Sequence, residues 1–220
     1  MRFRSPLAAL LLPLISISGI SEAQTMTPIA LKPPRLDRGL TMMRALEARA
    51  SAAEFDASPL GPQDLSDLLW AANGVNRPAS GKRTAPSAMN AQDIDVYLLL
   101  EAGAYLYDAA GHRLEPVAKG DYRPLAAGRQ DKFAQAPAIC LLVSDIFRFR
   151  HGEDSLKLVW AAEDAGIVSQ NIALFCAAAG LAARPRASMD APRLKEALKL
   201  SATQHPMLNC PVSYQSHQRK

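Results

Sequence analysis

The segment that most constrains the fold spans residues 156–180 and has the sequence LKLVWAAEDAGIVSQNIALFCAAAG. It is long enough for about seven helical turns, and apolar side chains occupy nearly every side of such a helix. Its polar interruptions are Glu163, Asp164, Ser169, Gln170 and Asn171. A helix that is hydrophobic all round is normally surrounded by protein. Because one domain of this size has a limited core, we expect a second subunit to cover part of this helix.

The rest of the chain indicates an α+β fold. Apolar residues at helical spacing come first, strand-like segments fill the middle, and a helix pair with a late strand follows. The expected helices lie within residues 36–50, 58–74, 156–180 and 190–200, and the expected strands within 94–117, 138–145 and 207–214. Because strands and helices do not alternate, we expect a small antiparallel or mixed sheet flanked by helices.

Residues 1–23 carry the pattern of a secretory signal peptide. Arg2 and Arg4 form a basic start, residues 7–17 are almost continuously apolar, and small residues precede position 24. The apolar run is shorter than the roughly 20 residues of a membrane-spanning helix, so no membrane span is expected. A mature amphipathic helix is disfavoured because the run has no polar face. We therefore expect a periplasmic or secreted protein that begins near Gln24.

The mature chain is expected to form one domain over residues 35–220, after a Pro-rich, extended lead-in at 24–34. The formal net charge of the whole chain is only +4. Basic residues do not form a dense run with interleaved aromatic side chains, so a nucleic-acid partner is not expected.

The cysteines and histidines do not suggest a metal site. Cys140, Cys176 and Cys210 each stand among apolar residues, at spacings that match no zinc pattern, and the four histidines are scattered. No bound metal is therefore expected, and the oxidation state of the cysteines stays open.

Familiar catalytic motifs are missing from the sequence. It contains no GxSxG, no HExxH and no phosphate-binding GxxxxGK[ST]. A secreted hydrolase is therefore disfavoured, and catalytic side chains cannot be assigned. If the protein is an enzyme, we expect a cofactor to supply the reactive group, and a flavin fits because the protein then mainly binds and orients it.

Several quoted motifs together resemble the nitroreductase superfamily. They are LSDLLWAANGVNR at 65–77, PSAMNAQ at 86–92, EDAGIVSQNIALFCAAAGLA at 163–182 and PVSY at 211–214. The chain is most similar to an exported branch that also resembles the SagB-type, thiazole-forming dehydrogenases. The resemblance implies an intertwined homodimer with FMN bound at the interface by both subunits.

The family's opening motif, Arg-Arg-Ser-x-Arg-x-Phe, is only partly kept. Its first Arg and its Ser match Arg49 and Ser51, which the resemblance assigns to the FMN phosphate and ribityl chain. The other two basic positions are Ala50 and Ala53, and Glu54 adds a negative charge. A charge-assisted contact is worth roughly 1.5–3 kcal/mol, so this loss weakens the phosphate site unless Arg77, Arg83 or Arg219 replaces it.

The PSAMNAQ segment resembles the part of the family that lies against the flavin, reached from the partner subunit. The matching cofactor-binding residues are Pro86, Ser87, Ala88 and Asn90, followed by Gln92. Small residues let the backbone approach the ring, and Ser87 and Asn90 can supply hydrogen bonds. Alternatively, Ser87 merely caps a short turn.

The resemblance also places residues 183–188 near flavin N5, where a backbone N–H would tune the cofactor. Arg184 and Arg186 in that loop are either solvated or in contact with an anionic substrate. Residues 120–123 are expected at the rim, with Tyr122 as a candidate proton donor.

The sequence therefore predicts an exported FMN-dependent oxidoreductase that transfers a hydride through N5 to or from a small organic substrate. Nitroaromatics, quinones and azoline-like rings are the substrate classes that the resemblance implies. The alternative is a non-catalytic periplasmic binding module that has kept the fold and lost FMN.

Overall fold

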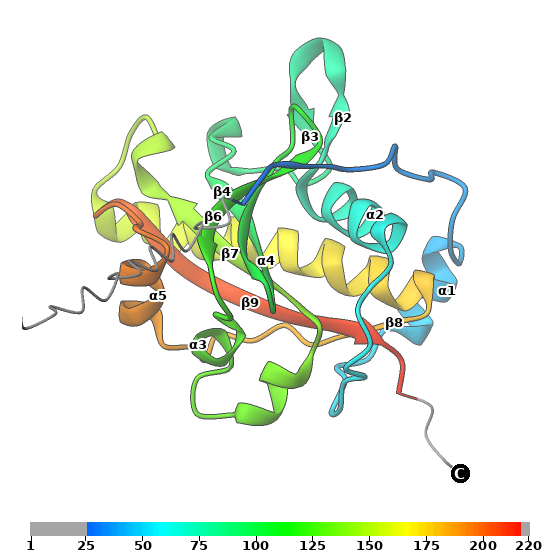
Figure 1. Ribbon diagram of the computed structural model, residues 1–220. Coiled ribbons are helices and arrows are strands. Elements are labelled where there is room, and N and C mark those ends of the chain that lie inside the picture. The colour runs from blue at the N-terminus through cyan, green and yellow to red at the C-terminus, as the bar shows by residue number, and fades with distance from the viewer. Residues whose placement is uncertain (1–25, 217–220) are drawn as a thin grey trace, which may run out of the picture.

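The computed structural model describes residues 26–216 and shows a sheet with helices on both faces (Figure 1). The signal-peptide prediction for residues 1–23 and the FMN contact predicted for Arg219 lie outside this range. Among the helices of residues 26–216, none has the length and apolar character needed to cross a membrane.

Seven strands form the main sheet in the order β1-β6-β5-β4-β7-β9-β8, and every neighbouring pair is antiparallel. Their bounds are β1 Ile29–Ala30, β4 Ile94–Leu100, β5 Gly103–Asp108, β6 Arg113–Lys119, β7 Ala138–Asp145, β8 Leu181–Ala183 and β9 Gln204–Tyr214. The expected α+β fold is confirmed. The two short strands at the sheet edges, β1 and β8, were not expected.

The central strands are apolar on both sides because both faces of the sheet are covered. Val96 and Leu98 of β4 pack in the core that contains α2 (Pro62–Asn73) and α4 (Asp154–Ala179), whereas Tyr97 and Leu99 face the second core. That second core contains side chains from α3 (Arg123–Ala127) and α5 (Ala191–Ala197). Two covered faces explain why β7 has a continuous apolar sequence.

The helix expected over residues 36–50 is shorter than predicted. Only α1, Met42–Ala48, is helical, and Leu36 and Met43 are exposed. Gly39 interrupts the pattern with a φ of 96°, and the following backbone N–H of Leu40 donates to Ala178 O at 3.1 Å. The segment before α1 therefore follows tertiary contacts and not a helical path.

A small ribbon joins α2 to the 86–92 segment. Strands β2 (Val75–Arg77) and β3 (Lys82–Arg83) pair antiparallel around a 3₁₀ turn, η1 (Pro78–Ser80). Figure 1 shows this ribbon projecting from the body of the molecule near α2. Further 3₁₀ turns are η2 (Ala88–Asn90), η3 (Asp131–Gln135) and η4 (Ile146–Arg148).

Within the described residues, the long helix α4 is covered by its own chain on one side only. Ala165, Val168 and Ile172 are buried against the sheet core. On the other side, Val159 is 52% exposed, and a Cβ atom added at Gly166 would meet nothing within 4 Å. An exposed apolar stripe on a central helix is typical of a surface that another chain covers.

Candidate functional site

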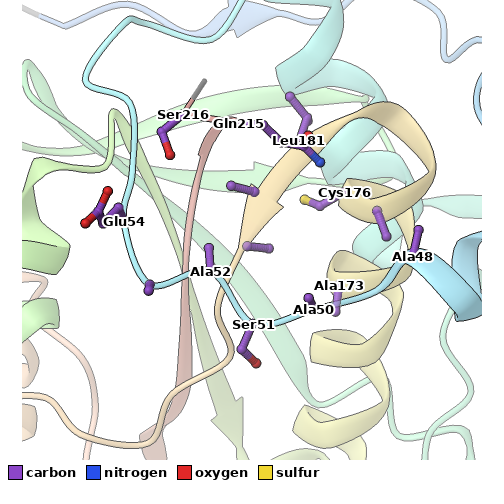
Figure 2. A pocket seen from close by; sticks show the side chains of 14 residues that line it. Ala48, Ala50, Ser51, Ala52, Glu54, Ala173, Cys176, Leu181, Gln215 and Ser216 are labelled. Atoms are coloured by element: carbon purple, nitrogen blue, oxygen red, sulfur yellow. The ribbon is translucent and has the colours of Figure 1, made fainter. Parts of the chain in front are cut away.

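A cavity of about 1080 Å³ lies between the loop after α1 and the end of α4 (Figure 2). Strand β8 and the residues after β9 complete its wall. The lining residues are Ala48, Ala50, Ser51, Ala52, Ala53, Glu54, Ala173, Cys176, Ala177, Leu181, Ala182, Ala183, Gln215 and Ser216. This volume is in the range of small-molecule and cofactor sites. Because so many lining side chains are methyl groups, a flat ligand can approach the backbone closely.

Three contacts hold the 48–54 loop against the sheet. The backbone N–H of Ala52 donates to Ala183 O at 3.0 Å, and Arg184 Nη1 donates to Ala52 O at 3.0 Å. Just beyond the loop, Phe55 packs edge-on against Phe133, with ring centroids 5.9 Å apart. The sequence motif around residues 49–55 thus becomes a fixed wall of the cavity.

Of the residues predicted to bind the FMN phosphate and ribityl chain, Ser51 lines the cavity and Arg49 stands between two lining residues. Arg49 is half-buried; its backbone N–H donates to Ala45 O at 2.9 Å, and its side chain has no hydrogen bond or ion pair within residues 26–216. Its guanidinium is therefore free to bind an anion. Ser51 is exposed, so the cavity is open to solvent on this side.

The 86–90 segment lies elsewhere in the same chain. The backbone N–H of Ala88 donates to both carboxylate oxygens of Asp164, at 3.0 and 2.9 Å, in the first half of α4. Ala173 lines the cavity nine residues further along this helix. Because an α-helix rises about 1.5 Å per residue, the two sites are roughly 14 Å apart along the axis. One chain therefore does not bring the two predicted groups of cofactor residues together.

The 86–92 segment has an unusual backbone. Met89, Asn90 and Gln92 have φ angles of 52°, 53° and 49°, in the left-handed region that side-chain-bearing residues rarely adopt. Ser87 Oγ accepts the backbone N–H of Gln92 at 2.8 Å, which closes this turn. Ser87 thus has the turn-stabilising role that was the alternative to cofactor binding. Strained backbone of this kind concentrates at functional sites.

The side-chain amides of Gln92 and Asn90 differ in whether they are free to bind a ligand. Gln92 is used internally, because its Oε1 accepts from Arg83 Nε at 3.0 Å and its Nε2 donates to Gly81 O at 3.1 Å. Asn90 is exposed, and its side chain makes no hydrogen bond to any other part of the 26–216 range. Asn90 is therefore the member of this segment that is free to contact a ligand.

A buried carboxyl pair supports the 86–92 segment, and sequence reasoning missed it. Asp93 is fully buried, accepts a hydrogen bond from Ser144 Oγ at 2.5 Å, and neighbours the carboxylate of Asp164. Its Oδ1 atom has no hydrogen-bond partner within residues 26–216. Burial, together with the negative charge of Asp164, raises the pKa of Asp93 to about 7. Asp93 therefore holds a proton in a large fraction of the molecules near neutral pH.

The loop after β8 leaves two backbone donors unused. Arg184 N donates to Pro211 O at 3.2 Å and Arg186 N donates to Asn209 O at 2.8 Å, while Pro185 has no N–H. Among residues 184–188, the N–H groups of Ala187 and Ser188 therefore have no acceptor in the described part of the chain. These two amides are the ones that can donate to a bound molecule.

Other predicted side chains do not line the cavity. Arg77 and Arg83 belong to the β2–β3 ribbon, where Arg77 Nη2 donates to Arg83 O at 2.7 Å. The hydroxyl of Tyr122 donates to Lys119 O at 3.0 Å, and Tyr122 is absent from the cavity lining. Within one chain, these groups do not replace the basic residues missing at Ala50 and Ala53.

The three cysteines are buried and free. Cys140 and Cys210 lie opposite each other on β7 and β9, and Cys176 touches the inner wall of the cavity. Within residues 26–216, no three His, Cys, Asp or Glu side chains gather where they could hold a metal ion.

The comparison with protein families identifies the chain. The model of the nitroreductase family matches residues 46–214, which include the 48–54 loop, the 86–92 segment and α4. The chain belongs to the nitroreductase family. Membership of this family makes the protein an oxidoreductase, and its members typically bind FMN.

Individual nitroreductase relatives agree with this assignment. A solved structure from Ralstonia eutropha JMP134, provisionally named a nitroreductase, is 36% identical, with a TM-score of 0.81 over 86% of this chain and 90% of that one. A Methanocaldococcus jannaschii protein, also provisionally named a nitroreductase, is 27% identical over 173 residues, which are 74% of this chain and 86% of that protein.

The fold also resembles a more distant structure. A chain in the E. coli microcin synthetase McbBCD complex with truncated pro-MccB17 has a TM-score of 0.68 at 18% identity, over 97% of this chain and 85% of that one. At this identity the likeness concerns the fold alone.

Proposed function

We propose that the protein is an exported, homodimeric, FMN-dependent oxidoreductase that transfers a hydride to or from a small organic molecule. The observation that carries this proposal is the methyl-lined cavity of a nitroreductase-family chain. Ser51 lines this cavity, Arg49 lies between two of its lining residues, and β8, which forms part of its wall, leads into the loop with the unused N–H groups of Ala187 and Ser188.

The residues around the cavity suit FMN. Arg49 and Ser51 would bind the phosphate and ribityl chain through charge-assisted and hydroxyl hydrogen bonds. The backbone N–H groups of Ala187 and Ser188 would donate to the ring system. Bound FMN would supply the hydride chemistry, and the protein would bind the ring, orient it and limit the access of water.

The two-subunit arrangement would complete the site. The 86–92 segment lies roughly 14 Å from its own cavity wall along α4, by the helical rise, and presents the free amide of Asn90. The uncovered stripe of α4, with Val159 and Gly166, offers a surface for a second copy. We propose that the partner subunit's 86–92 segment reaches the cavity when these surfaces pair.

The compartment bears on the direction of the reaction. The signal pattern at residues 1–23 supports export, and NAD(P)H is not expected outside the cytoplasm. Oxidation of an azoline-like ring, or reduction of a nitroaromatic or quinone with another donor, then fits better than NAD(P)H-driven reduction. N-terminal sequencing of protein from the periplasmic fraction tests export, and an uncleaved, cytoplasmic chain would contradict it.

An absorbance spectrum tests the cofactor. The mature protein from Gln24, exported and purified without added cofactor, is expected to show flavin bands near one equivalent per chain. Light scattering of the same sample is expected to give twice the chain mass. A protein that stays colourless after incubation with FMN would overturn the proposal and favour the alternative of a binding module. Absence of the basic residues at Ala50 and Ala53 would then be the physical cause.

A further inference from the structure

Three cations surround the ring of Phe133 beside the cavity wall. Arg186 Cζ lies 4.4 Å from the ring centroid, Arg184 Cζ 5.3 Å and Lys132 Nζ 5.3 Å. We call these four residues the Phe133 corner. Its ring also meets Phe55, the residue that follows the 48–54 loop. Cations over an aromatic face are attracted to its quadrupole, but the ring does not neutralise them.

Arg186 is a fixed, buried charge. Its side chain is engaged by four neutral acceptors: Ala126 O at 3.2 Å, Ala127 O at 2.8 Å, Gln130 Oε1 at 2.8 Å and Asn209 Oδ1 at 3.0 Å. Burial lowers the pKa of its guanidinium, and the like charge of Arg184 lowers it further. The two guanidinium groups are therefore close enough to repel each other. Because both of its terminal nitrogens are engaged and, within residues 26–216, only Nε–H has no acceptor, the role of Arg186 is to position the loop and to contribute positive potential.

Arg184 is the cation of the corner that can bind a ligand. It is half-buried, and within residues 26–216 its only side-chain hydrogen bond goes to Ala52 O on the cavity wall. A guanidinium has five N–H donors, so most remain available. Within residues 26–216, Arg184, Arg186 and Lys132 form no ion pair, although exposed Asp131 precedes Lys132 in the chain. Arg186 is buried, Arg184 is half-buried and Lys132 is exposed, so the part of this like-charged cluster that is shielded from water lacks an anionic partner.

We propose that Arg184 binds the anionic group, a carboxylate or a phosphate, of a molecule held in the cavity. Arg186 and Lys132 strengthen the local positive potential, and Phe133 orients the guanidinium. This inference rests on the proposed function, because the anion belongs either to FMN itself or to an acidic substrate bound over it. Arg184 also compensates for the basic side chains that the family motif has and that Ala50 and Ala53 lack.

The test uses Arg184→Ala, Arg184→Lys and, as a charge-matched control, Arg113→Ala on β6, which lies toward the opposite end of the sheet from β8. Fluorescence titration of flavin-free protein gives dissociation constants for FMN and for riboflavin, which lacks the phosphate. Spectral titration of flavin-loaded protein then compares 4-nitrobenzoate with uncharged nitrobenzene. Melting temperatures of all variants check that the fold is kept.

We expect Arg184→Ala to weaken the binding of one anionic ligand at least tenfold, Arg184→Lys less, and Arg113→Ala by less than twofold. Weaker FMN binding with unchanged riboflavin binding assigns the anion to the flavin phosphate. Weaker 4-nitrobenzoate binding with unchanged flavin and nitrobenzene binding assigns it to an acidic substrate.

Two outcomes overturn the inference. One is unchanged binding of all four ligands in Arg184→Ala. The other is an equal loss for FMN and riboflavin, which would mean that Arg184 only holds the loop through Ala52. If the wild-type protein binds neither flavin, the proposed function fails, and calorimetry with 4-nitrobenzoate and nitrobenzene on the flavin-free protein still tests the anion site by itself.

Discussion

The backbone N–H of Ala88 donates to both carboxylate oxygens of Asp164, 76 residues further along the chain. This contact joins the strained turn that contains Asn90 to the long central helix. Because the N–H of Ala88 already donates to Asp164, a ligand at this turn would have to bind other groups, such as the side-chain amide of Asn90. The Asp164 carboxylate attaches the turn to α4, while the Ser87–Gln92 hydrogen bond closes the turn itself, so removing the carboxylate tests the attachment.

Removing that carboxylate is expected to destabilise the protein. Asp164 is only 3% exposed, so Asp164→Ala leaves the N–H of Ala88 buried without an acceptor. An unsatisfied buried donor costs about 1–3 kcal/mol, and the free energy of unfolding from urea titration should fall by that amount. Glu163→Ala, on the exposed neighbour, is expected to change it by less than about 0.5 kcal/mol. Equal effects of the two substitutions would mean that the contact does not hold the turn.

The stability of the protein is expected to depend on pH through Asp93. Its pKa is raised from 3.8 to about 7 in the folded chain by burial and by the charge of Asp164. Between these values the folded state holds a proton that the unfolded state has lost. Stability linked to this group is therefore greatest below about pH 4, falls as the pH rises, and levels off above about pH 7.

Asp93→Asn tests this dependence because it mimics the protonated acid. The amide can still accept from Ser144 and can donate toward Asp164, but it does not titrate. Urea titrations at pH 5, 6, 7 and 8 should show that the free energy of unfolding of the variant, relative to that of the wild type, rises as the pH increases. If the free energies of unfolding of the two proteins changed with pH in parallel, the raised pKa of Asp93 would be contradicted.

Asn90 is expected to affect cofactor binding without affecting stability. Its side chain has no hydrogen bond within residues 26–216, and its φ of 53° is one that Asp also tolerates. Asn90→Asp removes the amide donors and adds a negative charge, so the dissociation constant for FMN should rise about tenfold, or ~1.4 kcal/mol. The same change at exposed Asn76, on the β2–β3 ribbon, should leave it unchanged. An unaltered FMN affinity in Asn90→Asp would remove Asn90 from the proposed site.

The elements that the sequence predicted well are those with continuous or periodic apolar patterns. The run at residues 138–145 is β7, and the expected helix at 156–180 is α4, which ends where Gly180 adopts a φ of 72°. Strand β8 could not be found in this way, because Leu181–Ala183 has no strand pattern and is extended only through pairing with β9. The predicted long helix before residue 50 failed because tertiary contacts replaced helical hydrogen bonds.

The site was partly accessible from the sequence. The motif around Arg49 and Ser51 forms the wall of the large cavity, while binding of FMN there stays a prediction. The same two alternatives, a solvated side chain or an anion ligand, applied to Arg184 and Arg186 in the sequence. Folding separates the two residues, since Arg186 makes four side-chain hydrogen bonds to carbonyl and amide oxygens and Arg184 makes one within residues 26–216. The role of Asp93 could not be predicted from the sequence, because its partner Asp164 is distant in sequence and only the tertiary fold brings the two together.

The cysteines are expected to stay reduced and unreactive even in an oxidising compartment. All three thiols are buried, and burial raises the pKa of Cys210 to about 12, so almost no thiolate forms at pH 8. A thiol-specific reagent such as Ellman's should label none of them in the native protein at pH 8 and three per chain in guanidinium chloride. Cys140 and Cys210 lie opposite each other on neighbouring strands, so they are the pair that a disulfide would join. One thiol per chain after denaturation, in place of three, would show that this bond forms and that the cross-strand pair is oxidised on export.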